Sequence, residues 1–178
     1  MKKYDRKSLR RICLGGILAA LSIVFGKLLA FNVGETFRVS LENLPIILAG
    51  ITLGPVFGAA VGMVADLVGC LIVGYTVNPF ITLGAMAVGF VSGLAVKVFS
   101  KDRRVGNFLA VLLAHVVGSI LIKTAGLSWF YGTDYLTLLV YRCINYALIV
   151  AVEYTIIYIL MKNKGVMSIL GSLGGDEK

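Results

Sequence analysis

The stretch LPIILAGITLGPVFGAAVGMVADLVGCLIVG, residues 44–74, is apolar almost throughout and is too long for one straight helix across a bilayer. Gly54 and Pro55 interrupt it part-way along. A proline lacks the N–H donor and clashes with the preceding turn, so it can end one helix and start the next. The stretch is therefore either one kinked helix or two helices, and the number of membrane crossings depends on which.

The positions of the basic residues favour two helices. Four more apolar tracts are present, so two helices here give six crossings, and 13 of the 17 Lys and Arg residues then lie on the cytoplasmic side, in 1–11, 97–104 and 162–178. Five crossings would place 97–104 and the C-terminus outside, against the positive-inside rule. The sequence predicts an all-α polytopic membrane protein, one integral membrane domain over 1–178 with both termini cytoplasmic. Its six transmembrane helices are expected at about 11–31, 44–53, 55–74, 79–99, 105–126 and 139–162.

The composition supports a protein of the cell membrane and argues against several other classes. Hydrophobic residues make up 58% and charged residues 15%, below the roughly 25% charged of soluble domains. The net charge of +8 follows from the cytoplasmic clusters, so no nucleic-acid partner is expected. No phosphate-binding loop occurs, so ATP hydrolysis is not expected of this chain. The three cysteines are not spaced like metal ligands, and the chain has one histidine, so we expect neither a metal nor a cofactor.

Small residues recur at intervals of four, which lets helix backbones approach closely in lipid. Gly54, Gly58 and Gly62 form such a stripe, and Ala85, Gly89 and Gly93 form another, which indicates packing within the bundle or a surface that slides on a partner. The first helix offers two adjacent stripes, and there packing and partner docking are equally supported. Those stripes are Gly15 with Ala19, and Gly16 with Ala20.

Charged residues inside spans cost about 2.5–3.5 kcal/mol at a helix centre, so they are candidates for function. Asp66 suggests ligand or proton recognition, with a buried hydrogen bond as the alternative. Lys27 is expected to extend to the interface, and Lys123 and Arg142 either do the same or form an anion site. His115 and Glu153 are expected to form an internal pair, with a proton relay as the alternative.

Two more features flank the predicted outer loops 32–43, 75–78 and 127–138. Asn78 before Pro79 is expected to cap a helix, although its side chain could instead donate to a ligand. Trp129, Tyr131 and Tyr135 fit either an interfacial aromatic belt or a ligand site under the third outer loop.

The central third of the chain resembles the substrate-binding S components of energy-coupling factor (ECF) vitamin transporters, and among them most the folate-specific ones. The resemblance lies in RVSLENLP (38–45), GPVFG (54–58), ADLVGC (65–70) and NPFITLG (78–84). It implies a transport subunit that is not an enzyme. It also implies docking through small residues of the first helix on a transmembrane coupling subunit with two cytosolic ATPases. After docking, the loaded subunit is expected to topple and release its ligand inside.

Folate carries a pterin edge, an aromatic middle and two carboxylates, and the sequence offers candidate partners for each part. Asp66 and Asn145 are candidates for the pterin, Trp129 or Tyr131 for the aromatic middle, and Arg38, Lys123 and Arg142 for the carboxylates. The alternatives are an S component for another vitamin or a modified-base precursor, an intramembrane enzyme acting on a lipid, and a secondary transporter working alone.

Overall fold

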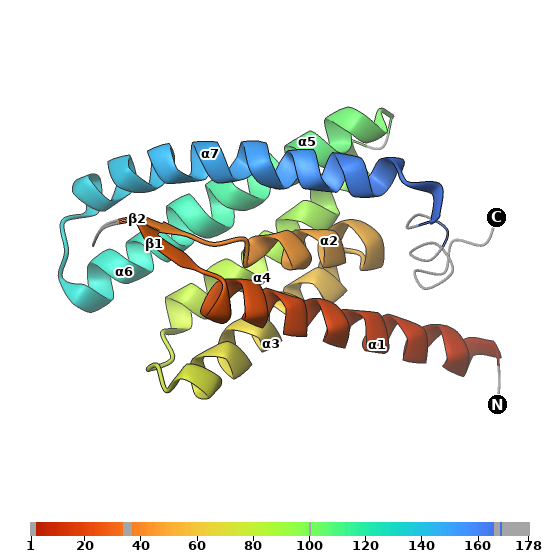
Figure 1. Ribbon diagram of the computed structural model, residues 1–178, viewed down its shortest axis with the longest axis horizontal. Helices are drawn as coiled ribbons and strands as arrows, with labels where there is room; N and C mark the ends of the chain where they lie inside the picture. The colour runs from red at the N-terminus through yellow and green to blue at the C-terminus, as the bar shows by residue number, and fades with distance from the viewer. Residues whose placement is uncertain (1–2, 34–36, 100, 166–167, 169–178) are drawn as a thin grey trace.

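The protein is described from a computed structural model, which covers residues 3–33, 37–99, 101–165 and 168, with side chains described over 8–30, 40–99, 101–165 and 168. In this part of the chain, five helices are long and apolar enough to cross a membrane, and a sixth apolar helix is shorter. Figure 1 shows the chain running back and forth along one axis, with Lys3, where the first helix begins, and Lys162, where the last one ends, at one end of the bundle. The predicted all-α membrane fold is confirmed.

The helices begin and end close to the predicted positions in the middle of the chain. They are α1 (Lys3–Ile23) continued by the π-helix η1 (Val24–Leu28), α2 (Asn43–Leu53), α3 (Pro55–Val73), α4 (Pro79–Val98), α5 (Arg103–Ala114) continued by the π-helix η2 (His115–Ile122) and α6 (Lys123–Tyr131), and α7 (Tyr135–Lys162). Gly54 makes the turn that separates α2 from α3. Its φ is 95°, a backbone conformation that glycine adopts without steric cost and that other residues rarely adopt. Pro55 then starts α3.

Three predicted boundaries near the outer end differ from the structure, including the start of the last helix, which lies at Tyr135 rather than 139. The first helix ends at Leu28 rather than 31, and a short antiparallel hairpin follows, with β1 (Phe31–Val33) paired to β2 (Phe37–Val39). The fifth helix continues to Tyr131, so the loop expected over 127–138 shrinks to three residues, Gly132 to Asp134. Gly132 takes the left-handed conformation that ends a helix, and Asp134 caps α7 by accepting from the Thr137 backbone N–H at 2.9 Å.

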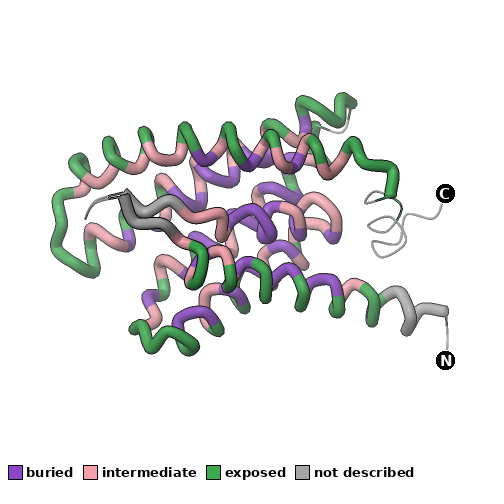
Figure 2. The backbone as a smooth tube through the Cα atoms, viewed as in Figure 1, coloured by how far each residue is buried: buried purple, intermediate pink, exposed green. Residues whose placement is uncertain are grey.

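The short helix α2 is enclosed by the other helices. Most of its residues are buried, on every side of the helix, and it packs against α1, α3 and α4. Figure 2 shows buried residues concentrated along this central region, whereas α7 and one side of α1 are largely exposed. A helix that is apolar all round belongs in such an interior. At 11 residues α2 is short for a helix that crosses a bilayer, and its contacts with the surrounding helices make this length compatible with the fold.

The glycine stripes pack α3 against α4. A Cβ atom added at Gly58 would overlap the Gly89 carbonyl oxygen, and one at Gly62 would overlap the Ala85 carbonyl oxygen. Of the two interpretations of these stripes, the contacts favour packing within the bundle and not a surface that slides on a partner. Gly54 takes no part in the contact, since nothing lies within 4 Å of its added Cβ.

Candidate functional site

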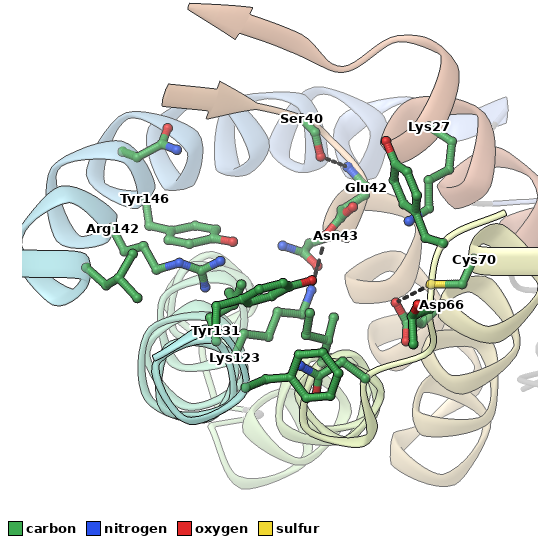
Figure 3. A pocket seen from close by; sticks show the side chains of 18 of the residues that line it. Lys27, Ser40, Glu42, Asn43, Asp66, Cys70, Lys123, Tyr131, Arg142 and Tyr146 are labelled. Atoms are coloured by element: carbon green, nitrogen blue, oxygen red, sulfur yellow. Dashed lines mark hydrogen bonds and ion pairs between the residues drawn. The ribbon is translucent and has the colours of Figure 1, made fainter. Parts of the chain in front are cut away.

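A cavity of about 700 Å³ opens at the end of the bundle that holds the β1–β2 hairpin and the α6–α7 turn. Its walls come from η1, the segment before α2, the outer half of α3, the 74–78 turn, α6 and the first half of α7. Figure 3 shows Arg142 and Tyr146 on one side of the cavity and Asp66, Cys70 and Lys27 on the other. The volume lies within the range of about 300–1,000 Å³ that small-molecule sites occupy.

Asp66 and Asn78 form one polar side of the cavity. The Asp66 carboxylate accepts from the Thr82 hydroxyl at 2.6 Å and from the Cys70 thiol at 3.9 Å. Asn78 caps α4, as predicted, because its Oδ1 accepts from the Phe80 backbone N–H at 3.0 Å. Its Nδ2 atom is buried and has no hydrogen-bond partner among the described residues. A buried donor of this kind is normally satisfied, so Nδ2 is available to a ligand.

Lys123 lies at the floor of the cavity and is 4% exposed. Its ammonium donates to Glu42 Oε1 at 3.1 Å and to Asn43 Oδ1 at 3.4 Å. A charge in a low-dielectric interior requires such partners. Lys123 therefore does not extend to the interface, and Glu42 balances its charge. Glu42 and Asn43 are not among the predicted site residues, although both lie in the 38–45 stretch that carries the family resemblance.

Arg142 forms the opposite polar side. Its Nη1 donates to the Ser119 carbonyl at 2.8 Å, and its guanidinium carbon lies 6.0 Å from the centre of the Tyr146 ring. One of five N–H donors serves the Ser119 bond, and a guanidinium can bind a carboxylate through two more. Arg142 thus borders the cavity as a cation held in place by backbone and aromatic contacts.

Lys27 also borders the cavity, although the sequence suggested a position at the interface. Its ammonium lies 5.5 Å from the centre of the Tyr75 ring, a cation–π contact across from Arg142. A substituent at Gly69 would meet the Lys27 side chain, so α3 carries glycine where the lysine passes. The tyrosines at 75, 141 and 146 were missed as well, because neither their spacing nor their neighbours distinguish them from aromatic residues that face lipid.

The structure brings together five of the seven predicted site residues: Asp66, Lys123, Tyr131, Arg142 and Asn145. Trp129 is not among the lining residues. It is 75% exposed and packs edge-on against Phe80, with ring centres 5.2 Å apart. Arg38 lies on β2 opposite Asn32, and its side chain lies outside the described residues. On α6, Tyr131 falls two positions beyond Trp129 and therefore points in a different direction.

The predicted internal pair of His115 and Glu153 is confirmed. His115 Nε2 lies 2.7 Å from Glu153 Oε2, and both side chains are fully buried between η2 and α7. On α1, the two small-residue stripes face different ways. Gly15 and Ala19 are buried, Gly15 next to Val61 of α3, whereas Gly16 and Ala20 are exposed.

Comparisons with known proteins agree with this architecture. The family described as "ECF transporter, substrate-specific component" matches residues 10–173. A crystal structure of FolT bound with folic acid superposes with a TM-score of 0.69 at 28% identity, over 84% of this chain and 90% of that one. An S component for biotin superposes at 0.65 and 18% identity over 96% and 99%, and an S component of a bacterial ECF transporter at 0.61 and 20% over 88% and 99%. The last two show a shared fold.

Among curated proteins, none matches the chain in sequence. The family match spans nearly the whole chain, and the bundle and cavity are those of a membrane protein that binds a small molecule. In ECF transporters this subunit binds the transported vitamin and joins partner subunits, and the ATPase activity lies in those separate subunits. The chain is therefore an integral membrane substrate-binding subunit, not an enzyme, and it belongs to the family of substrate-specific S components of ECF transporters.

Proposed function

We propose that this S component binds folate and delivers it to an ECF-type importer. The observation that carries the proposal is the presence of two different polar sides in the cavity, Asp66 with Asn78 on one and Arg142 on the other, with the tyrosines 131 and 146 also in its lining. Folate has the matching order of groups, a pterin, an aromatic ring and a glutamate. The likeness to FolT bound with folic acid supports the same ligand class.

The pterin is placed at Asp66. A carboxylate accepts two hydrogen bonds at once, and the pterin offers an amino group beside a ring N–H. The Thr82 hydroxyl, 2.6 Å from the carboxylate, holds it from behind and fixes its orientation. The buried Nδ2 of Asn78 supplies a donor for a pterin acceptor. Asn145 borders the same cavity from α7 and remains a candidate for the pterin.

The glutamate tail is placed at Arg142. Its planar guanidinium suits a carboxylate better than a lysine does, since two parallel hydrogen bonds form. Lys123 contributes to the electrostatic field, but Glu42 already occupies its ammonium. Arg38 is proposed for the second carboxylate, because β2 lies at the same end of the bundle. Tyr131 and Tyr146 flank the aromatic middle of the ligand.

The outward stripe of α1 is proposed as the docking surface for the coupling subunit. Gly16 and Ala20 are exposed, and a Cβ added at Gly16 meets nothing within 4 Å. Such a smooth strip lets another helix approach closely in lipid. The inward stripe, Gly15 and Ala19, is already used by α3 and the core. Two cytosolic ATPases beneath the coupling subunit would complete the importer.

Ligand-dependent thermal stabilisation of the purified protein tests the ligand. Folate, 5-formyltetrahydrofolate, pteroate, biotin, riboflavin and thiamine would be titrated against protein in nanodiscs. The proposal expects stabilisation by the folates and weaker stabilisation by pteroate, which lacks the glutamate. Stabilisation by biotin, riboflavin or thiamine alone would assign another vitamin to the same cavity.

A further inference from the structure

The buried His115–Glu153 pair lies next to the cavity without bordering it, as far as the described residues form its wall. One hydrogen bond joins the two side chains, and His115 Nδ1 and Glu153 Oε1 have no hydrogen-bond partner among the described residues. Buried polar atoms without partners destabilise a fold, and well-packed apolar residues can replace a buried ionic pair without loss. Stability of the bundle alone therefore does not account for this pair.

The ring of His115 contacts the wall of the cavity. Its centre lies 4.9 Å from the centre of the Tyr146 ring, at an interplanar angle of 35°. Tyr146 borders the cavity, and the Arg142 guanidinium lies over the same tyrosine. Glu153, His115, Tyr146 and Arg142 thus form a continuous series of contacts from the buried interior to the cavity.

The π-helix η2 links the two ends of this series. It starts at His115, and the carbonyl of Ser119, one turn later, accepts from Arg142. A π-helical segment is uncommon and occurs often beside functional sites, because it changes the direction of side chains and frees backbone carbonyls. Both Arg142 and Tyr146 of α7 therefore depend on how η2 lies against α7.

The attachment of α7 to the bundle is narrow at this level. Its buried residues are Ile149, Glu153 and Ile157, which form one stripe along the helix. Glu153 is the ionisable member of that stripe, and its bond to His115 is directional, unlike the apolar contacts beside it. A directional bond fixes the rotation of α7 about its own axis, which apolar packing alone specifies poorly.

We propose that His115 and Glu153 are positioning residues for ligand binding, which hold the Tyr146 ring and the Arg142 guanidinium in the orientation that the ligand requires. This inference rests on the proposed function only in taking the cavity as the vitamin site. It assigns no ligand contact to either residue. The pair acts through η2 and α7, whose side chains make those contacts.

The geometric part is tested without any ligand. Fluorotyrosine incorporated at the eight tyrosines gives a ¹⁹F spectrum in which Tyr146→Phe identifies the Tyr146 resonance. The double variant His115→Gln, Glu153→Gln keeps two partners able to bond but removes the imidazole ring. The inference expects the Tyr146 resonance to shift or broaden while that of Tyr75, across the cavity, stays unchanged. An unchanged Tyr146 resonance would overturn it.

The functional part uses exchange of the two residues. In the variant His115→Glu, Glu153→His, a hydrogen bond can form again, but a carboxylate replaces the imidazole against Tyr146. The inference expects the melting temperature to recover relative to His115→Gln alone, and the dissociation constant to stay raised by roughly threefold to tenfold, the size of one lost hydrogen bond. Full recovery of affinity would mean that the pair only stabilises the fold.

Ile157→Ala provides the matched control, because Ile157 lies one turn beyond Glu153 on the same stripe and is equally buried. It is expected to lower the melting temperature and leave affinity within about twofold.

If the exchanged variant does not fold, the glutamine pair takes its place in the affinity measurement. If the wild type binds biotin rather than folate, the same comparison is made with biotin. If it binds none of the panel, the proposed function fails, and the fluorine spectrum still decides this inference.

Discussion

Asp66 and Arg142 illustrate, at the scale of single residues, how polar groups near the membrane interior acquire a function. Asp66 is held by Thr82 and Cys70, neither of which carries a positive charge, so its carboxylate can still accept hydrogen bonds from a ligand. Arg142 is held by one carbonyl and one ring. Each charged group is oriented by its neighbours, and neither forms a salt bridge among the described residues. Lys123 differs, since Glu42 neutralises it.

Asp66→Asn is expected to weaken folate binding at least about tenfold, because an amide replaces the charged acceptor of two pterin hydrogen bonds. Isothermal titration with the protein in nanodiscs measures the change. Cys70→Ala serves as the control, since the thiol touches the same carboxylate at 3.9 Å but contributes little. An unchanged dissociation constant for Asp66→Asn would remove Asp66 from the site.

Arg142→Ala is expected to weaken folate binding more than pteroate binding, because only folate presents the glutamate carboxylates to the guanidinium. The ratio of the two dissociation constants should approach one in the variant. Equal losses for both compounds would show that Arg142 stabilises the cavity and does not read the tail.

Lys123→Met is expected to destabilise the protein by about 1–3 kcal/mol, because it removes the buried ammonium that pairs with the Glu42 carboxylate and donates to Asn43. Adding Glu42→Gln should recover most of the loss, since no unpaired charge remains. Melting temperatures of the two single variants and the double variant give this comparison. Additive losses would mean that the two residues act independently.

Two helices use small residues for different purposes at the scale of elements. On α3, Gly58 and Gly62 lie against the backbone of α4, whereas on α1 Gly16 and Ala20 face away from the bundle. The same spacing therefore serves internal packing in one helix and is free for a partner in the other. The rotation of each helix about its axis separates the two uses.

Gly62→Leu is expected to lower stability by about 1–3 kcal/mol, because the side chain would overlap the Ala85 carbonyl.

Gly16→Leu should leave the melting temperature and the dissociation constant unchanged, yet reduce co-purification with the coupling subunit. A Gly16→Leu protein that assembles normally would exclude this stripe as the docking surface.

The stability of the first turn of α7 depends on the protonation state of Asp134, which caps the helix. Hydrogen bonds from the Thr137 N–H and hydroxyl to the Asp134 carboxylate lower its pKa below the ordinary 3.8. A lowered pKa in the folded state means that the cap stabilises the helix above the ordinary value and is lost as the pH falls through the lowered one. Hydrogen exchange in the first turn of α7 should then rise in acid relative to Asp134→Asn, whose cap does not titrate.

At the scale of the whole molecule, the distribution of charge predicts the orientation in the membrane. The cavity lies at the end of the bundle away from the basic start of α1, the end of α4, the start of α5 and the end of α7. Under the positive-inside rule this end is expected to face outward, on the side from which an importer takes its ligand. The enclosed α2 helix lets polar residues at its start, Glu42 and Asn43, reach the cavity floor without meeting lipid.

Labelling of intact cells tests this orientation. In a variant without the three native cysteines, Asp134→Cys is expected to react with an impermeant maleimide, whereas Asp102→Cys should react only after lysis. Both positions are exposed on the structure, so access to the reagent depends on the side of the membrane. The opposite pattern would invert the topology and place the cavity inside.

Local signals in the sequence determined the membrane fold. Gly54-Pro55 and the cap at Asn78 act on their own neighbourhood, so the break between α2 and α3 and the start of α4 could be predicted. The basic clusters predict six crossings and their direction, which the labelling experiment tests. Gly132 and Asp134 are also local signals, for the end of α6 and the start of α7. They were not used because the aromatic residues between 129 and 135 suggested a longer loop.

Tertiary structure decided how the helices are rotated and which residues meet across long separations. Glu42 pairs with a lysine 81 positions away, Trp129 faces out of the site although Tyr131 faces in, and one stripe of α1 is buried while the other is free. In a sequence that is apolar on nearly every face, hydrophobic periodicity does not specify helix rotation. Close packing of glycines and the pairing of buried charges specify it instead.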